Sequence, residues 1–272
     1  MLLVVTQPDR PGNRMKLAPS PVRAAALDLG LPIAQPERIR DAATVERLQA
    51  LAPELLVVVA YGQLIPRSII NIPARGIVNV HASLLPRHRG AAPVAHAILA
   101  GDRVTGITIM RMDELLDHGP LLAVEKVGID DRETSPRLSA RLATVGARLL
   151  CDALEQLDSI VPLDQDHARA TMAPRLRKED GRLRWEMTAG EIDRRVRALQ
   201  PWPGTTVDLR GRTIKIVAGR PVDGDGEPGS VLGRTRGGLV IATGKGAYRL
   251  EVVQLPGRGA MAANQLLSLP DA

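Results

Sequence analysis

The sequence predicts an α/β protein with a mostly parallel sheet, followed by a small β domain. Three patterns indicate this architecture. Continuous apolar runs, such as 55–60 and 76–80, are typical of parallel strands that are covered on both faces. Amphipathic helical patterns alternate with these runs, and the longest covers 135–157. After Pro203 the chain changes to short β runs separated by glycine turns, which is typical of a small barrel.

The elements of the first part follow in chain order. An apolar strand is expected over 1–6, and a helix begins at Pro21 with Ser20 as its N-cap and ends before Gly30. The same alternation predicts helices over 41–50, 66–70, 91–100 and 135–157, and strands over 55–60, 76–80, 106–117 and 121–127.

The second part begins after a segment rich in proline and charge. We expect a first domain over 1–160, a linker over 161–178 and a second domain over 179–272. The second domain is predicted to hold a helix over 191–199 and short strands over 205–209, 213–217, 229–232, 238–242 and 247–253.

Composition and charge narrow the class of protein. Of 272 residues, 44% are hydrophobic, which is typical of a globular chain and not of a disordered one. The net charge of +6 is unevenly placed: residues 1–176 carry 20 Lys and Arg against 19 Asp and Glu, and residues 177–272 carry 16 against 11. This excess predicts a polyanionic partner for the C-terminal part. Aromatic residues are so rare that base stacking is barely available.

Other classes of site are not expected. Cys151 is the only cysteine, so no intrachain disulfide can form, and its apolar helical context predicts a core position. The five histidines are scattered without metal-ligand spacing, so no metal is expected. No apolar stretch reaches the length of a membrane span and no signal peptide is present, so we expect a cytoplasmic protein.

Polar side chains at the ends of two strands mark a candidate active site. Asn79 and His81 close the strand over 76–80 and point to the same side, because side chains alternate along a strand. Asp117 ends a later strand, next to the turn residue Gly119. The carboxyl ends of parallel strands are where ligands bind in α/β sheets.

These residues occur within longer motifs that are similar to a known family. The pattern Asn79-x-His81-x-Ser83-Leu84-Leu85-Pro86 precedes Met112-Asp113-x-x-Leu116-Asp117-x-Gly119, and together they resemble the formyltransferases that use 10-formyltetrahydrofolate. The flanking motifs resemble the methionyl-tRNA formyltransferase family: Thr6-Gln7-Pro8-Asp9-Arg10-Pro11, Ala60-Tyr61-Gly62-Gln63, Arg87-x-Arg89-Gly90-Ala91-Ala92-Pro93 and Pro201-Trp202-Pro203-Gly204.

The resemblance implies a Rossmann-like formyltransferase fold followed by an OB-like β-barrel that holds tRNA. It implies transfer of the formyl group of 10-formyltetrahydrofolate to methionyl initiator tRNA, with Asn79, His81 and Asp117 as catalytic residues. Asn79 and His81 can donate hydrogen bonds to a developing oxyanion. Asp117 either orients His81 or accepts a proton, and the sequence leaves both roles open. The loop that would bind the folate is Ser83, Leu84, Leu85 and Pro86.

The resemblance also implies residues that contact the tRNA. Three lie in a turn-rich loop near the start of the chain, two at the end of the linker and two on the helix over 191–199. They are Arg10, Arg14, Lys16, Arg177, Lys178, Arg194 and Arg197. We expect a monomer whose partner is initiator methionyl-tRNA, without metal or membrane.

Four departures from the family pattern leave alternatives open. Leu115 stands where the family usually has glycine, and would be strained there if the position needs a positive φ. Arg111 stands where a neutral residue is usual, and His118 lies beside Asp117, where a small polar residue is usual. The family's first strand is missing, so a misread start or a truncated sheet with an open edge is expected. The alternatives are a formyltransferase or hydrolase of the same fold acting on another amine or on formyltetrahydrofolate, and an inactive binding remnant.

Overall fold

The structure is a computed structural model that describes residues 1–11 and 17–268. Arg14 and Lys16, two of the residues expected to contact tRNA, lie outside the described residues. The chain forms two compact units that interleave along the sequence. One unit comprises Met1–Ala91, Ile107–Glu125 and Gly146–Thr171, and the other comprises Ala92–Gly106, Lys126–Val145 and Met172–Ala272. The domain limits expected from sequence, with a linker over 161–178, therefore remain a prediction.

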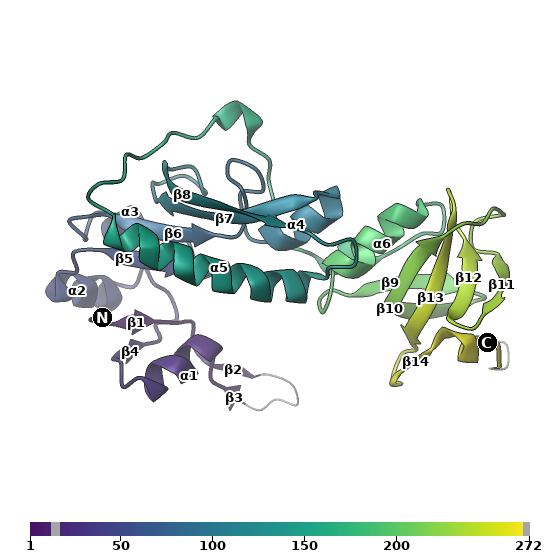
Figure 1. The fold of residues 1–272 in the computed structure, drawn as a ribbon. Helices are drawn as coiled ribbons and strands as arrows, with labels where there is room; N and C mark the ends of the chain where they lie inside the picture. Colours follow the sequence, from purple (N-terminus) through teal and green to yellow (C-terminus); the bar gives the residue numbers. More distant parts are fainter. Residues whose placement is uncertain (12–16, 269–272) are drawn as a thin grey trace. The chain divides into compact units, whose positions relative to one another are not determined.

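The first part of the chain alternates short strands with helices, which confirms the predicted α/β class (Figure 1). Ser20 caps the first helix, since its hydroxyl accepts a hydrogen bond of 3.2 Å from the backbone N–H of Arg23. In order, the elements are β1 (Val4–Val5), β2 (Arg10–Pro11), β3 (Leu17–Ala18), α1 (Pro21–Asp28), β4 (Ile33–Ala34), α2 (Ala42–Leu51), β5 (Leu56–Val59), α3 (Arg67–Ile70), β6 (Ile77–His81), α4 (Pro93–Ala100), β7 (Val104–Arg111), β8 (Leu121–Gly128) and α5 (Ser135–Glu155).

Two predictions about these elements are wrong. The strand expected to run to Asp117 ends at Arg111, because the chain turns back there and the Arg111 N–H donates to the carbonyl of Pro120. Asp117 therefore lies in the turn between β7 and β8. Cys151 was expected in the core but is exposed, because α5 turns Leu138 and Leu142 inward and Cys151 outward.

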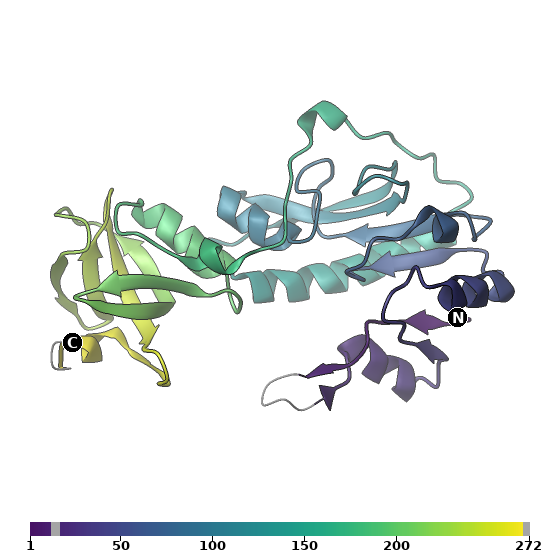
Figure 2. The ribbon, with the colours of Figure 1, turned by 180° about the vertical axis from the view of Figure 1, so that it is seen from behind.

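The strands of the first part of the chain form separate sheets. β1 pairs in parallel with β4, and the main sheet has the order β5-β6-β7-β8, in which β5 and β6 are parallel and β6 and β7 are antiparallel. Figure 2 shows the β1–β4 pair apart from the main sheet. Because β6 lies between β5 and β7, four of its five residues, Ile77 to Asn79 and His81, are buried.

β5 is an end strand of the main sheet, and one of its faces is exposed. Its alternate residues Leu56 and Val58 pack into an apolar cluster with Ile39, while Val57 and Val59 are 42% and 58% exposed. A strand of an α/β sheet is normally covered on both faces. In β5 only the face with Leu56 and Val58 is covered, and the valines on the other face are open to solvent.

The second part of the chain is an all-antiparallel β domain with one helix packed on it, as predicted. The strand order is β11-β12-β13-β10-β9, with β14 on β13. The elements are α6 (Ala189–Ala198), β9 (Thr205–Leu209), β10 (Arg212–Val222), β11 (Val231–Thr235), β12 (Gly238–Ala242), β13 (Ala247–Gln254) and β14 (Ala260–Ala262), with 3-10 helices over His167–Arg169, Lys178–Gly181 and Ala263–Ser268.

The strand β10 is longer than the predicted 213–217 because it serves two partners. Its first half pairs with β9 and its second half with β13, and the register shifts at Ala218 between them. Gly219 follows this bulge, and any side chain there would collide with the ring of Tyr248. The sequence shows a glycine at position 219 but not which strand lies beside it. The second half of β10 was therefore not predicted.

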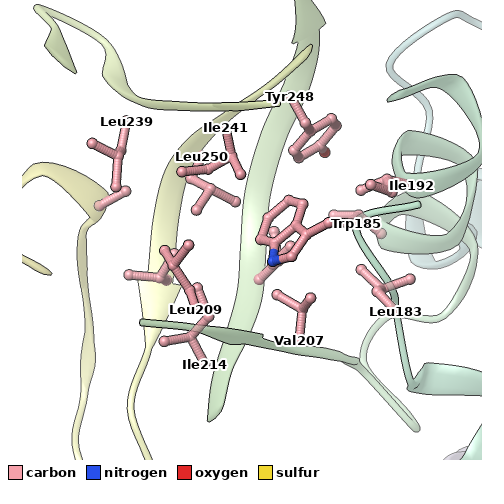
Figure 3. Packing of buried hydrophobic residues seen from close by; sticks show 14 of the residues in the cluster. Leu183, Trp185, Ile192, Val207, Leu209, Ile214, Leu239, Ile241, Tyr248 and Leu250 are labelled. Carbon is pink, nitrogen blue, oxygen red and sulfur yellow. The ribbon is translucent and has the colours of Figure 1, made fainter. Parts of the chain in front are cut away.

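The β domain encloses one mainly aliphatic core with two aromatic rings (Figure 3). Trp185 lies in the middle of it, between Ile192 of α6 and Val207 of β9, and its indole N–H donates to the carbonyl of Asp208 at 2.8 Å. Tyr248 is fully buried, and burial raises the pKa of its hydroxyl above the usual value. A single core supports the predicted fold of this domain.

Candidate active site

The three residues predicted to be catalytic lie together in the first unit. Asn79 and His81 lie on β6 and are buried, and Asp117 approaches them from the turn between β7 and β8. The Asn79 Nδ2 atom is 3.5 Å from Asp117 Oδ1, and His81 Nδ1 is 3.7 Å from Asp117 Oδ2. One carboxylate thus faces an amide and an imidazole that leave the same strand.

The imidazole of His81 is oriented through its second nitrogen. Its Nε2 atom is 2.9 Å from the carbonyl oxygen of His88. Because a carbonyl only accepts, Nε2 carries a hydrogen and Nδ1 faces Asp117. His88 has a φ of 58°, an uncommon backbone conformation for a residue other than glycine. This conformation accompanies a carbonyl that points at the His81 ring.

Asp117 is held in a tight turn. Its φ of 47° is in the left-handed region, which aspartate tolerates better than most residues. The carboxylate accepts a hydrogen bond of 2.7 Å from the backbone N–H of Gly90. Gly119 has no room for a side chain, since a Cβ there would collide with the carbonyl of Arg111. Gly119, two residues after Asp117, is therefore required by the close packing of the backbone.

The two unusual residues of this turn leave Asp117 in place. Leu115 is exposed and does not have a positive φ, and its N–H donates to Asp113 Oδ1 at 2.9 Å. The strain anticipated for a leucine here is absent. His118 faces Asp113 and not Asp117, since its Nδ1 atom is 2.7 Å from Asp113 Oδ2. Its ring stacks on His167 with centroids 3.9 Å apart.

The loop expected to bind folate is supported from below by Thr108 of β7. The Thr108 hydroxyl donates to the carbonyl of Ser83 at 2.6 Å and accepts from the N–H of Leu85 at 3.2 Å. The Ser83 hydroxyl donates to the carbonyl of Arg87 at 2.6 Å. Ser83 and Leu85 are buried, whereas Leu84 and Pro86 are half-buried. Two members of the loop thus fix its shape, and two remain accessible.

Sequence reasoning missed a polar network behind Asp117. The Arg89 guanidinium is buried and donates to Gln165 Oε1 from Nε at 3.2 Å and from Nη2 at 2.6 Å. The Gln165 amide donates to the carbonyls of Asp117 and Gly119 at 3.0 and 2.7 Å. Arg89 belongs to the motif that starts at Arg87, but Gln165 lies in the segment predicted to be a linker, where no periodicity distinguishes it.

Three of the residues expected to contact tRNA are exposed. Arg10 lies on β2, and Arg177 and Lys178 lie at the start of the 3-10 helix over 178–181. Arg177 is 3.9 Å from Glu179, an exposed pair of the kind that contributes little to stability. These cations are therefore accessible to a polyanion.

The two arginines expected to contact tRNA from α6 take part in internal contacts. Arg194 Nε donates to the carbonyl of Leu99 at the end of α4 at 3.2 Å. Arg197 donates to Asp193 Oδ2 at 2.7 Å and to the carbonyl of Glu133 at 3.1 Å. Burial raises the pKa of the Asp193 carboxyl, and the Arg197 guanidinium opposes that shift. Both arginines thus hold α6 in the second unit.

Across residues 1–11 and 17–268, no three His, Cys, Asp or Glu side chains group in a way that could hold a metal ion. No helix within those same ranges is long and apolar enough to cross a membrane.

Comparison with known proteins places both parts of the chain in one family. Residues 1–154 match the family described as formyl transferase, and residues 175–269 match the formyl transferase C-terminal domain. The chain is 44% identical over 270 residues to the methionyl-tRNA formyltransferase of Methylococcus capsulatus, covering 97% of this chain and 87% of that protein. It is 47% identical over 264 residues to that of Thermus thermophilus, covering 97% and 86%.

Solved structures share the fold at low identity. HypX from Aquifex aeolicus, solved with tetrahydrofolic acid, has a TM-score of 0.65 and 19% identity over 89% of this chain and 43% of that chain. WlaRD, a sugar 3N-formyl transferase solved with dTDP and 5-N-formyl-THF, has a TM-score of 0.65 and 18% identity over 86% and 81%. At these identities the likeness shows the fold alone.

Proposed function

Because the chain belongs to the formyltransferase family, we propose that it transfers a formyl group to the α-amine of methionine on initiator tRNA, giving formylmethionyl-tRNA for translation initiation. The main observation in support of this proposal is that the side chains of Asn79 and His81 both face the Asp117 carboxylate. The identities of 44% and 47% to methionyl-tRNA formyltransferases over 97% of the chain support this choice of substrate over another amine.

We propose 10-formyltetrahydrofolate as the formyl donor. Two proteins of the same fold are described with tetrahydrofolate or a formyl derivative. In this chain the loop over 83–86 has the features such a ligand needs: a backbone fixed by Thr108 and two half-buried apolar residues, Leu84 and Pro86. Backbone groups would bind the pterin, and the apolar residues would cover its faces.

The reaction places two demands on the side chains. The amine attacks the formyl carbon and gives a tetrahedral intermediate whose oxygen is negatively charged. Asn79 supplies a donor for that oxygen, because its amide has a second N–H besides the one that faces Asp117. Loss of one such donor typically costs about 2.7–4 kcal/mol in the barrier.

The second demand is for a group that moves a proton. The attacking amine must lose a proton, and N10 of the folate must gain one as its bond to the formyl carbon breaks. The His81–Asp117 pair can hold that proton in between, so that the pair is unchanged at the end. The carbonyl of His88 holds the His81 ring, and the N–H of Gly90 holds the Asp117 carboxylate, so the two groups stay facing each other. No covalent intermediate with the enzyme is needed.

We propose that the tRNA binds along exposed cations of the chain. The excess of 16 Lys and Arg over 11 Asp and Glu in residues 177–272 supports this, and Arg10, Arg177 and Lys178 are exposed. Arg14, Lys16, Arg194 and Arg197 remain candidates on the family pattern. As a translation enzyme the protein would act in the cytoplasm, and we propose that it acts as a monomer.

The direct test is transfer of labelled formyl from 10-formyltetrahydrofolate to methionyl initiator tRNA. We expect transfer to the tRNA and none to free methionine. Release of labelled formate without transfer would instead support a formyltetrahydrofolate hydrolase, and no turnover with normal tRNA binding would support an inactive remnant.

Salt dependence tests the contact with tRNA. Affinity should fall steeply between low and moderate salt, and Lys178→Glu should lower the slope of log K against log salt by about one phosphate contact. Lys126→Glu makes the same charge change at another exposed lysine and should leave the slope unchanged. Equal slopes for both variants would remove Lys178 from the interface.

A further inference from the structure

Gln165 links a segment far away in the sequence to the backbone of the catalytic turn. Its side chain is 5% exposed and lies in the same compact unit as Asp117. Both hydrogens of its amide are used, one on the carbonyl of Asp117 at 3.0 Å and one on that of Gly119 at 2.7 Å. The two carbonyls that it holds lie on either side of residue 118, so the amide spans the turn.

Arg89 determines which way the Gln165 amide faces. A guanidinium has donors only, so the atom that accepts its two hydrogen bonds must be the amide oxygen. The amide nitrogen therefore faces the turn, where carbonyls can only accept. Arg89 Nη2 also donates to His167 Nδ1 at 2.8 Å, so the guanidinium itself is held from a second side. Each of these contacts joins a donor to an acceptor.

The conformation of Asp117 needs such a support. Its φ of 47° is in a region that residues other than glycine seldom adopt. The surrounding contacts must therefore hold the backbone of Asp117 in this conformation. The Gly90 N–H holds the carboxylate and Gln165 holds the backbone of the same residue. If the backbone support is lost, the carboxylate can leave the position 3.7 Å from His81 Nδ1.

We propose that Gln165 is a positioning residue for formyl transfer, acting through Asp117, and that Arg89 orients it. The proposal rests on the proposed function. It also assigns a role in the active site to the segment that the sequence predicted to be a linker.

The test is Gln165→Glu, which keeps the shape of the side chain and its acceptor for Arg89 but removes both donors. We expect kcat to fall about ten- to hundredfold, because small displacements of a catalytic group have effects of this size. The KM values for folate and tRNA should stay within about twofold. The matched control is Gln156→Glu, the same change at an exposed glutamine of the same unit, and its kcat should equal that of the parent chain.

A variant that combines Gln165→Glu with Asp117→Asn distinguishes a role of Gln165 in positioning Asp117 from a general loss of structure. If Gln165 acts through Asp117, adding Gln165→Glu to Asp117→Asn should change kcat by less than about twofold. If the loss of kcat in the double variant equals the product of the losses in the two single variants, the proposal is overturned. A normal kcat in Gln165→Glu, with an active parent chain, would also overturn it.

A second measurement does not depend on turnover. The N–H of Gly90 donates to the Asp117 carboxylate, so its hydrogen exchange reports the position of that group. Exchange at Gly90 should be at least about threefold faster in Gln165→Glu and unchanged in Gln156→Glu. If the parent chain transfers no formyl group, the proposed function fails, and unchanged exchange at Gly90 then overturns the positioning role separately.

Discussion

The Asp117 turn and the C-terminal β domain are stabilised in opposite ways. The turn is held by hydrogen bonds to Gly90 and Gln165, and Asp117 itself has an unfavourable φ. The β domain packs Trp185 and Tyr248 into an aliphatic core whose members are mostly fully buried. Changes to the turn should therefore alter the rate of reaction, whereas changes to the core should alter the free energy of unfolding.

The largest effect is expected from His81→Ala. This change removes the ring between the His88 carbonyl and Asp117, so the proton has no path through the pair. The single-turnover rate should fall about 10²- to 10⁴-fold, while the Kd for tRNA stays within about twofold. A rate within threefold of the parent chain would show that the ring takes no part in the reaction.

The opposite result is expected from Trp185→Ala in the β domain. The indole fills the centre of the core and bonds to Asp208, so its loss should cost about 3–5 kcal/mol of unfolding free energy. Chemical denaturation followed by circular dichroism measures this. The control is Trp202→Ala at an exposed tryptophan, which should cost far less. Equal losses would mean that the core of the β domain does not limit stability.

A third prediction concerns the exposed face of β5. Val57 and Val59 are exposed, so changing both to threonine should alter the unfolding free energy by only about 0.5 kcal/mol. The same change should reduce aggregation, because it removes apolar surface beside an unpaired strand edge. Light scattering at rising protein concentration is the measurement. A loss of several kcal/mol would show that another part of the chain covers this face.

The smallest effect is expected at a helix cap of the β domain. The Thr188 N–H donates to Glu191 Oε2 at 2.8 Å, and this bond lowers the pKa of Glu191 below its ordinary value of 4.5. A lowered folded pKa stabilises the fold above the unfolded pKa, and this contribution is lost as the pH falls through the folded value.

Glu191→Gln should therefore cost at most about 0.5 kcal/mol at pH 7, because the pair is exposed and screened. The difference from the parent chain should shrink as the pH falls below about 4.5. Unfolding curves of the two chains at several pH values between 7 and 4 test this. A difference that grows on acidification would reverse the sign of the linkage.

Much of the fold could be predicted from the sequence, because periodicity reports burial. The strands β9 and β12 and the start of α5 fall where the pattern of apolar residues places them. Pairing across a sheet is not local, and so the second half of β10 and the strand β14 were missed. The end of β7 was placed too late, since the apolar residues continue after the chain has left the sheet at Arg111.

The candidate site could be predicted only as far as its motifs extend. Asn79, His81 and Asp117 lie in such motifs, and the structure brings them together. The contacts made by the carbonyl of His88 and the amide of Gln165 could not be predicted from the sequence. Backbone atoms have no residue type to reveal them, and a single glutamine in a polar segment resembles any other.

The role of the Asp117 carboxylate is tested by Asp117→Asn, which replaces one oxygen by an amide nitrogen and keeps the shape of the side chain. The measurement is the single-turnover rate of formyl transfer to methionyl initiator tRNA, together with the Kd of that tRNA. We expect a rate at least about 10²-fold lower and a Kd within about twofold of the parent chain. A near-normal rate would contradict the role of this carboxylate and of the network that holds it.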